Sequence, residues 1–505
     1  MPLSFSFASK LRRCPRPRLR SPGLAVALAA AALLAGCAVG PDYARPAPPP
    51  GTDLPAFKES GQWQPAAPAE IDARSGWWRV YGDPQLDALV EEANQANPTL
   101  AQAEAQYRQA QAAVQGARAA FFPTVGLNAS GNRGRSISNG IISEGNSHAW
   151  SLQASWEPDL WGGVRRQVEA ADDSAQARAA DLAAAQLAVQ AAVVDDYIQL
   201  RLDDQQLALY ARTIEGYRKA LALTQAQYRA GVVTAGDVAL AQNTLAAAQA
   251  QAVDLELTRR QLEHALAVLL GKTPGAFSLP ALPLDAHWQV VLPATPAGLP
   301  SQLLERRPDI AGAERRVAAA NAQIGVAQAA YYPNLILGAS GGYQGSGFGP
   351  WFLTPGRVWA LGAALAATLF DGGARSAQVE QARAALDAAA ASYRQTVLGG
   401  FQEVEDNLAA LGELAVERVA QEEAARAAHV AEQVYLAQYR AGTGLYTSVA
   451  TAQAQSLAAD RAVLQLRARE FAASVALIKA VGGGWSSDEL DAQTAQAFSS
   501  SSTSE

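Results

Sequence analysis

Short motifs recur along the chain at a nearly constant spacing. Three pairs of motifs share an offset of 210 or 211 residues: Phe121-Phe122-Pro123 with Tyr331-Tyr332-Pro333, Gly162-Gly163-Val164-Arg165 with Gly372-Gly373-Ala374-Arg375, and Tyr228-Arg229-Ala230-Gly231 with Tyr439-Arg440-Ala441-Gly442. Chance does not hold a register over such a distance. The sequence therefore predicts two copies of one structural unit, which we place at 83–296 and 297–485.

Proline placement predicts where long helices lie within each unit. None of the 26 prolines falls in 159–273 or in 356–505. Proline breaks helix interiors, and these stretches are rich in Ala, Gln, Leu and Arg, which favour helices. We expect helices at 163–230, from Asp237 (as a cap) to about 270, near 374–441 and at 446–481. Apolar residues seven apart in the first helix indicate a coiled-coil seam: Val193, Leu200, Leu207, Ile214, Leu221 and Tyr228.

The segments before these helices alternate between apolar and polar or small residues. Val125, Leu127 and Ala129 show this pattern, as do the stretches 150–157 and 359–369. Strands of about ten residues with one apolar face are typical of a transmembrane β-barrel. The alternative is a half-buried strand of a soluble sheet. Each unit supplies two strands around a Gly/Ser/Asn-rich loop, at 130–146 and at 341–350.

Four strands are too few to close a barrel, because bacterial barrels begin at about eight. An open sheet edge is not tolerated in lipid, so the chain is expected to assemble. Two copies would supply eight strands and three would supply twelve. Because an eight-stranded barrel is filled by its own side chains, an open pore favours three or more copies.

The N-terminus is typical of a secretory leader, which we place at 1–36. Six basic residues precede an apolar run from Leu24 to Leu34. The following Leu34-Ala35-Gly36-Cys37 resembles a bacterial lipobox. This resemblance implies cleavage before Cys37 and a covalent diacylglycerol and N-acyl chain on that residue. The alternative is a plain signal peptide with an incidental cysteine. Residues 37–82 are predicted to be a lipidated, Pro-rich tether, and 486–505 a disordered tail.

Composition argues against several functional classes. The formal net charge of −7 disfavours nucleic acid as a partner. Gly271-Lys272-Thr273 lacks the glycine five residues earlier that a phosphate-binding loop needs. The four histidines have no metal-ligand spacing. We therefore expect no catalytic residue, no metal and no cofactor other than the acyl chains.

Adjacent carboxylates are the other candidate for chemistry. They occur at Asp172-Asp173, Asp195-Asp196 and Asp203-Asp204. Neighbouring residues diverge by about 100° around a helix, so these pairs do not converge on one substrate. We expect them on a solvated or lumen-facing surface.

The motifs resemble the outer membrane factor (TolC-like) family, in particular its lipoprotein branch that serves resistance-nodulation-division multidrug efflux. The motifs that carry the resemblance are Cys37-Ala38-Val39-Gly40-Pro41-Asp42-Tyr43, Trp77-Trp78, Tyr81-Gly82-Asp83-Pro84-Gln85-Leu86, Arg306-Arg307-Pro308-Asp309-Ile310 with Glu314, Ala329-Ala330-Tyr331-Tyr332-Pro333 and Tyr439-Arg440-Ala441-Gly442.

The resemblance covers 37–485. It implies a mixed α/β membrane protein: a homotrimer with a twelve-strand β-barrel in the outer membrane, continued by a helical tube across the periplasm. It also implies a periplasmic membrane-fusion adaptor and an inner-membrane pump as partners.

In this family the two helix-turn-helix tips form the periplasmic entrance. The resemblance places adaptor contacts at Arg229, Ala230, Gly231, Arg440, Ala441 and Gly442. It places the entrance at Asp237, Thr447 and Thr451. Relatives commonly carry an Asp two residues before a Gln, where this chain has Thr451 before Gln453. An acidic gate ring is therefore in doubt, and Gly231 and Gly442 could equally serve only to end helices.

We predict a passive outer-membrane exit duct for drugs or other small toxic solutes. Two alternatives remain open: the duct of a protein secretion system, which has the same fold, and a non-conducting structural envelope lipoprotein. The alternating strands argue against the last.

Overall fold

The computed structural model describes residues 38–50, 57–60, 76–283, 288, 290–293, 306–346 and 356–487. The predicted leader, the lipidation residue Cys37 and most of the predicted tail lie outside these residues. The chain divides into two compact units. The sheet unit contains the described residues of 1–41, 120–166 and 325–375, and the helical unit contains those of 42–119, 167–324 and 376–505. Each unit thus draws on both predicted repeats. No helix among the described residues is long and apolar enough to cross a membrane.

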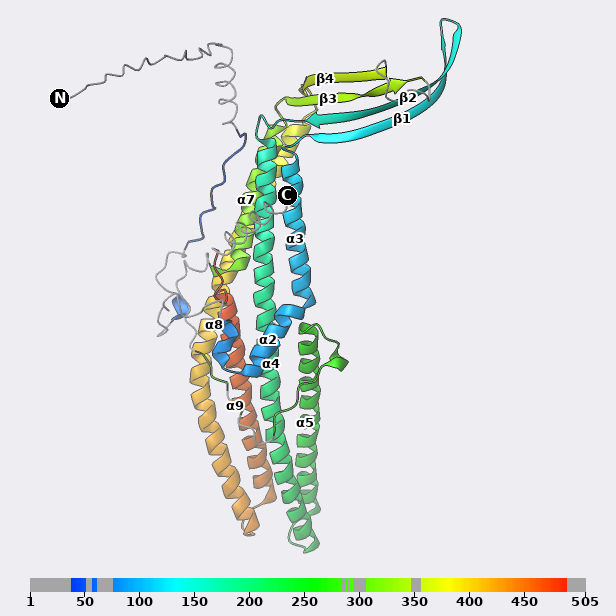
Figure 1. Cartoon of the computed structure of the whole chain (residues 1–505). Coiled ribbons are helices and arrows are strands. Elements are labelled where there is room, and N and C mark those ends of the chain that lie inside the picture. The colour runs from blue at the N-terminus through cyan, green and yellow to red at the C-terminus, as the bar shows by residue number, and fades with distance from the viewer. Residues whose placement is uncertain are drawn as a thin grey trace, which may run out of the picture. The chain divides into compact units, whose positions relative to one another are not determined.

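The helices come in pairs of equal length (Figure 1). The pairs are α3 (Pro98–Ala119) and α7 (Pro308–Ala329) with 22 residues, α4 (Gly163–Arg229) and α8 (Ala374–Arg440) with 67, and α5 (Ala235–Leu269) and α9 (Tyr446–Ala480) with 35. A shorter helix, α2 (Pro84–Ala96), and the 3-10 turns η1 (Lys58–Ser60), η3 (Trp77–Tyr81) and η4 (Pro274–Ala276) complete the described helical elements. The four long helices predicted from proline placement are confirmed, although α5 begins two residues before the predicted Asp237.

The four described strands form one antiparallel sheet in the order β1-β2-β3-β4 (Figure 1). They are β1 (Thr124–Ser138), β2 (Ile141–Trp156), β3 (Asn334–Gly345) and β4 (Arg357–Ala366). The predicted alternation is therefore confirmed as strand, and β2 pairs with β3 across the two predicted repeats. The outer edges of β1 and β4 have no partner strand in the described sheet.

The predicted loop at 130–146 is wrong. β1 continues to Ser138 and β2 begins at Ile141, so only Asn139 and Gly140 connect them. Both residues have positive φ, at 52° and 76°. This conformation belongs to the tight two-residue hairpin turns that match the twist of the strands, and Asn-Gly is the preferred pair for it. In the second predicted loop, β3 likewise continues to Gly345, and residues 347–350 lie outside the described part of the chain.

Paired residues show that the sheet has one apolar face. Leu127 lies opposite Leu152, Trp150 opposite Tyr343, and Leu335 opposite Leu365. The side chains of Leu127, Leu152 and Leu365 are each at least half exposed. We call this surface the apolar face. Most residues of the other face are polar or small, such as Asn128 and Ser151, with Ile141, Ile336 and Val358 as exceptions.

The start of each 22-residue helix binds the end of a 35-residue helix in a similar way. The Asn97 side-chain amide donates to the Leu269 carbonyl at 2.7 Å. At the matched place, the Arg307 guanidinium donates to the Ala480 carbonyl at 3.1 Å and pairs with Glu403 at 2.7 Å. These bonds satisfy carbonyls that a helix end leaves without an intrahelical partner.

Candidate functional site: the hairpin tips and a buried polar cluster

The turn between α4 and α5 is set by Gly231. We call residues 230–234 the α4–α5 tip. Gly231 has φ of 75°, its amide donates to the Tyr228 carbonyl at 2.9 Å, and the Val232 amide donates to the Gln227 carbonyl at 2.9 Å. This pair of bonds around a left-handed residue is the Schellman motif, which ends helices and favours glycine.

The turn between α8 and α9 has the same backbone geometry. We call residues 441–445 the α8–α9 tip. Gly442 has φ of 76° and donates to the Tyr439 carbonyl at 3.1 Å, and Thr443 donates to the Gln438 carbonyl at 2.9 Å. The helix-ending role considered for both glycines is therefore confirmed. Both tips lie at the same end of the helical unit (Figure 1).

The two tips differ in how the second helix begins. Thr234 is the N-cap of α5: its hydroxyl accepts from the Asp237 amide, and the Asp237 carboxylate accepts from the Thr234 amide at 2.9 Å. The prediction that Asp237 itself is the cap is wrong, because the threonine side chain caps the helix three residues earlier. Asp237 completes this reciprocal capping box. In α9 the N-cap is Leu445, which offers no side-chain bond.

Packing takes the place of capping at the α8–α9 tip. Tyr439 is 3% exposed, and its ring meets that of Tyr446 edge-on at 5.3 Å. The Tyr439 hydroxyl lies 3.0 Å from the Thr224 hydroxyl of α4. A little further along, the Tyr217 hydroxyl donates to the Gln453 carbonyl at 3.1 Å. The two hydroxyl contacts join the hairpins, whereas the ring contact lies within the α8–α9 hairpin. Burial raises the pKa of Tyr446 to about 12.

The remaining predicted tip residues are exposed. Arg229, Ala230, Arg440 and Ala441 all lie at the surface, and neither guanidinium forms an ion pair within the described chain. Thr447 and Thr451 are also exposed, and the Thr451 hydroxyl donates to the Thr447 carbonyl of its own helix. The structure thus places the predicted contact residues in or next to the tips and the predicted entrance residues in the first two turns of α5 and α9, where Thr451 supplies no charge.

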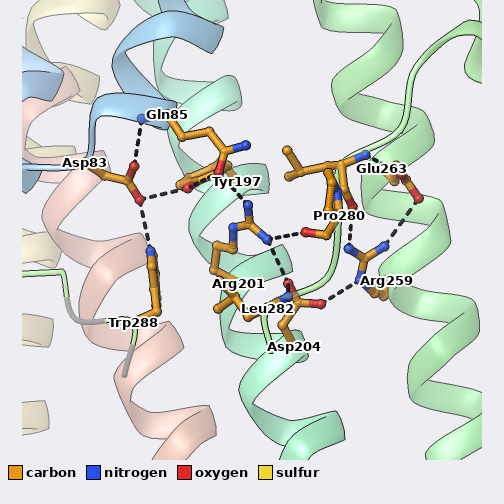
Figure 2. Close-up of polar contacts among 11 residues, drawn as sticks. Asp83, Gln85, Tyr197, Arg201, Asp204, Arg259, Glu263, Pro280, Leu282 and Trp288 are labelled. Carbon is orange, nitrogen blue, oxygen red and sulfur yellow. Dashed lines mark hydrogen bonds and ion pairs between the residues drawn. The ribbon is translucent and has the colours of Figure 1, made fainter. Parts of the chain in front are cut away.

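Sequence reasoning missed a buried polar cluster further along α4, drawn in Figure 2. It joins α2, α4, α5 and the segment after η4. Asp83 caps α2 by accepting from Gln85, and it also accepts from Tyr197 at 2.7 Å and from Trp288 at 2.9 Å. Burial would raise the pKa of Asp83, but the hydrogen bonds from Trp288 and Tyr197 hold it below its ordinary value.

Asp204 lies at the centre of this polar cluster and is fully buried. It pairs with Arg201 at 3.0 Å and with Arg259 at 2.6 Å. The same arginines donate to the backbone carbonyls of Pro280 and Leu279. The expectation of a solvated or lumen-facing surface is therefore wrong for this pair of carboxylates, because both Asp203 and Asp204 are at most 3% exposed. The arrangement holds backbone segments together and presents no reactive group.

Beside the polar cluster, a cavity of about 1100 Å³ is lined by α4, α8, α9 and by Leu282, Pro283 and Trp288. One imidazole in its wall, His429, lies 3.0 Å from the Ser456 hydroxyl and 2.9 Å from Asp460. The residue types are those of a hydrolytic triad. Ser456 is 3% exposed in the interior of α9, however, where the neighbouring amides are used in the helix and cannot stabilise an oxyanion. Within the described residues, no group of three or more His, Cys, Asp or Glu side chains could hold a metal ion.

Several residues of the motifs that carry the resemblance form hydrogen bonds within the helical unit. The Tyr43 hydroxyl donates to Glu314, which links the N-terminal segment to α7. Trp77 donates to Gln190 at 2.9 Å in the core beside α4. These residues therefore fix the fold of the helical unit.

Comparison with known proteins agrees with this architecture. The model of the outer membrane efflux protein family matches residues 89–272 and 299–483. The pyoverdine export outer membrane protein OpmQ of Pseudomonas putida is 33% identical over 88% of this chain and 93% of its own length. The toluene efflux pump outer membrane protein TtgC of the same species is 30% identical over 90% and 94%.

Solved structures of outer-membrane channels are also similar. The channel OprN has a TM-score of 0.80 at 31% identity, covering 89% of this chain and 100% of that one. The open state of the channel MtrE of Neisseria gonorrhoeae has a TM-score of 0.77 at 29% identity, covering 89% and 98%.

Proposed function

Because this chain belongs to the outer membrane efflux protein family and is the outer-membrane channel of a tripartite efflux system, we propose that it works as a trimer whose strands form one twelve-strand barrel. The protein lies in the outer membrane and extends into the periplasm. The observation that carries the proposal is the sheet: its apolar face is exposed, and both outer edges lack a partner strand among the described residues. Lipid offers no hydrogen bonds to such edges, so other copies must pair with them.

We also propose that the two halves of the chain are copies of one unit. The equal lengths of the paired helices, the matched Schellman turns and the matched bonds of Asn97 and Arg307 support this. Three copies would then supply six helical hairpins, which continue the barrel as a tube through the periplasm.

The proposed action is passive conduction. Solutes enter at the tips, where members of this family meet a periplasmic adaptor and an inner-membrane pump, and they leave through the barrel. The exposed Arg-Ala-Gly triplets at 229–231 and 440–442 are the proposed adaptor contacts. Asp237, Thr447 and Thr451 are the proposed entrance residues. Because the relatives are named for the export of pyoverdine and toluene, we propose small organic solutes as cargo.

We further propose that the protein is not an enzyme, that it is held to the membrane by acyl chains on Cys37, and that it needs no other cofactor. Two acyl chains or more give stable attachment, whereas one is marginal. Replacement of Cys37 by Ser is expected to abolish palmitate incorporation in metabolic labelling. Unchanged labelling would exclude lipidation at this residue.

Conductance in planar bilayers tests the duct. The purified protein is expected to conduct weakly, because its tips hold the entrance closed, and to conduct strongly after deletion of 230–233 and 441–444. A trimer that shows no conductance after both deletions would exclude a duct and favour the structural lipoprotein. A protein secretion duct would instead pass the conductance test and fail to restore solute tolerance to cells that lack their own channel.

A further inference from the structure

The three arginines of the described strands lie at the two unpaired edges of the sheet. Arg133 and Arg135 are on β1, and Arg357 is on β4. Strand alternation puts all three on the apolar face, since Arg135 follows the odd-numbered Leu127 and Arg357 lies opposite Tyr343. All three are exposed. Charged side chains are costly on a face that contacts lipid chains, unless they lie near the headgroups.

Aromatic rings indicate where the sheet reaches the level of the lipid headgroups. Trp150 and Tyr343 stack at 5.3 Å on neighbouring strands, and Trp359 is 71% exposed on the same face. Tryptophan and tyrosine gather where membrane hydrocarbon meets the headgroups. Arg357 lies opposite Tyr343 and two residues from Trp359, so its guanidinium reaches the headgroup region.

The repeat predicts how β4 pairs with a second copy. Pro123 and Pro333, before β1 and β3, fix an offset of 210 between those strands. The registers within the two hairpins then require an offset of 211 between β2 and β4. Within the chain, Trp150 of β2 lies opposite Tyr343 of β3. If β4 pairs with the partner's β1 as β2 pairs with β3, the offsets of 211 and 210 convert Trp150 to Leu361 and Tyr343 to Arg133. Leu361 then lies opposite the partner's Arg133.

The same register places Trp359 opposite the partner's Arg135 and Leu365 opposite the partner's Ala129. The apolar face continues from one copy to the next, because apolar-face residues of β4 pair with apolar-face residues of the partner's β1. Arg357 then lies diagonally across from the partner's Arg135, at about 7–8 Å between backbones, which long side chains can bridge. A shift of two residues, which also keeps the faces, would bring these two arginines directly opposite each other.

We call the paired edges of β4 and the partner's β1 the seam. The guanidiniums of Arg357 and of the partner's Arg133 and Arg135 gather there. Like charges placed across strands repel, so a counter-charge is needed. Glu144 pairs with Arg135 at 3.4 Å, but Arg133 and Arg357 form no ion pair within the described chain. Arginine binds phosphate through paired hydrogen bonds, and it is the residue best suited to that geometry.

We propose that each seam between copies binds the phosphate group of an outer-leaflet membrane lipid, held by Arg357 of one copy and by Arg133 and Arg135 of the partner subunit. The exposed ring of Trp359 lies beside this group and packs against the apolar part of the lipid. The proposal rests on the trimer proposed above, because neither sheet edge alone gathers the three arginines.

The first experiment tests the seam. Both cysteines of the chain, Cys14 and Cys37, precede the strands, so disulfides introduced in the sheet are easily identified. The variant with Ala129→Cys and Leu365→Cys is expected to form covalent trimers in membranes. A matched variant with Leu127→Cys and Leu365→Cys is displaced by two residues and is expected to cross-link poorly. Absence of cross-linked oligomers in both variants would overturn the assembly itself, and stronger cross-linking of the displaced variant would overturn the register.

The second experiment tests the site in the assembled trimer. Delipidated protein is titrated with a diphosphorylated lipid A, its dephosphorylated form and inorganic phosphate, with native mass spectrometry as the readout. Only the phosphorylated lipid is expected to bind tightly. The variant Arg133→Gln/Arg357→Gln should bind it at least about tenfold more weakly, since each charge-assisted bond contributes about tenfold.

Arg260→Gln is the matched control, because Arg260 is an exposed, ion-paired arginine on α5. It is expected to bind the phosphorylated lipid like the wild type. Equal binding by Arg133→Gln/Arg357→Gln and the wild type, with trimers intact, would overturn the lipid site and leave the trimer standing. Tight arginine-dependent binding of inorganic phosphate alone would overturn the lipid as ligand.

Discussion

The middle and the tips of the helical unit are held together by different chemistry. In the middle, the polar cluster buries the Asp204 carboxylate between two guanidiniums, which donate to the adjacent backbone carbonyls of Pro280 and Leu279. At the tips, the Thr224 and Tyr439 hydroxyls join the two hairpins by a neutral contact, Tyr439 packs on Tyr446 within its own hairpin, and a glycine ends both α4 and α8. A buried ion pair fixes the relative position of the segments that carry it, but removing one partner leaves the other charge buried and strongly destabilises the fold. Neutral contacts can be broken and re-formed at lower cost, which agrees with the entrance proposed at the tips.

Loss of Asp204 is expected to have the largest effect. Asp204→Ala leaves Arg201 and Arg259 buried without their shared partner, and the expected loss is about 3–5 kcal/mol of unfolding free energy. Denaturant unfolding of the purified protein measures it. Asp254→Ala, at an exposed position on α5, is the control and should change stability by less than about 0.5 kcal/mol. Equal effects would contradict the importance of the polar cluster.

Loss of the buried tip tyrosine should come next and should act locally. Tyr439→Ala removes the ring contact with Tyr446 and the hydroxyl contact with Thr224, at a cost of about 3 kcal/mol. Tyr228→Ala, at the matched and half-exposed position of the other hairpin, should cost less than about 1 kcal/mol. Amide hydrogen exchange at 436–450 distinguishes the two. Similar exchange in both variants would contradict the inference that side-chain packing contributes more at the α8–α9 tip than at the α4–α5 tip.

A pH effect is expected in the middle and not at the tips. Burial raises the pKa of Asp203 to about 6, and one of its oxygens has no hydrogen-bond partner within the part of the chain that the structure describes. The folded state therefore binds the proton more tightly than the unfolded state, and unfolding free energy falls as pH rises from about 4 to about 6. Asp203→Asn should stabilise the protein by about 2 kcal/mol above pH 6 and by little below pH 4.

Unfolding curves of both proteins at several pH values provide the measurement for Asp203→Asn. A gain that does not depend on pH would show that the carboxylate is not the cause. The wild-type tips, joined by tyrosine and threonine hydroxyls, should keep the same protection factors over this pH range, once exchange rates are divided by the intrinsic rate at each pH.

The smallest expected effect compares the two tips directly. Thr234→Ala removes the capping box of α5, at a cost of about 1 kcal/mol. Leu445→Ala, at the matched N-cap of α9, removes no side-chain bond and should be nearly neutral. Hydrogen exchange of the first turn of each helix reports both. Faster exchange in α9 than in α5 would contradict the capping assignment.

The sequence predicted the long helices because their limits are local. Prolines exclude helix, and Gly231 and Gly442 end helices through their own backbone conformation. Thr234 was missed as the cap of α5, although a threonine three residues before an aspartate is a local pattern. The hairpin at 130–146 was mistaken for a loop because its small residues hid the alternation, and the Asn139-Gly140 turn could have been recognised.

The buried position of Asp203 and Asp204 could not be predicted in this way. Arg259 is 55 positions from Asp204 and Leu282 is 78, and nothing adjacent in the sequence indicates these contacts. The roles of the tip residues toward an adaptor stay predictions, since they depend on another protein.

The equal lengths of the paired helices constrain how this protein can change during evolution. Each helical residue adds about 1.5 Å along the axis, so deletion of seven residues from α4 alone would move its turn by about 10 Å relative to the α8 turn. The contact between Thr224 and Tyr439 could not survive that displacement. A viable change in length must therefore occur in both hairpins, on both arms of each, and in whole heptads. Insertions and deletions in related sequences should be coupled in this way, and an engineered shortening should remove the same number of residues from all four long helices.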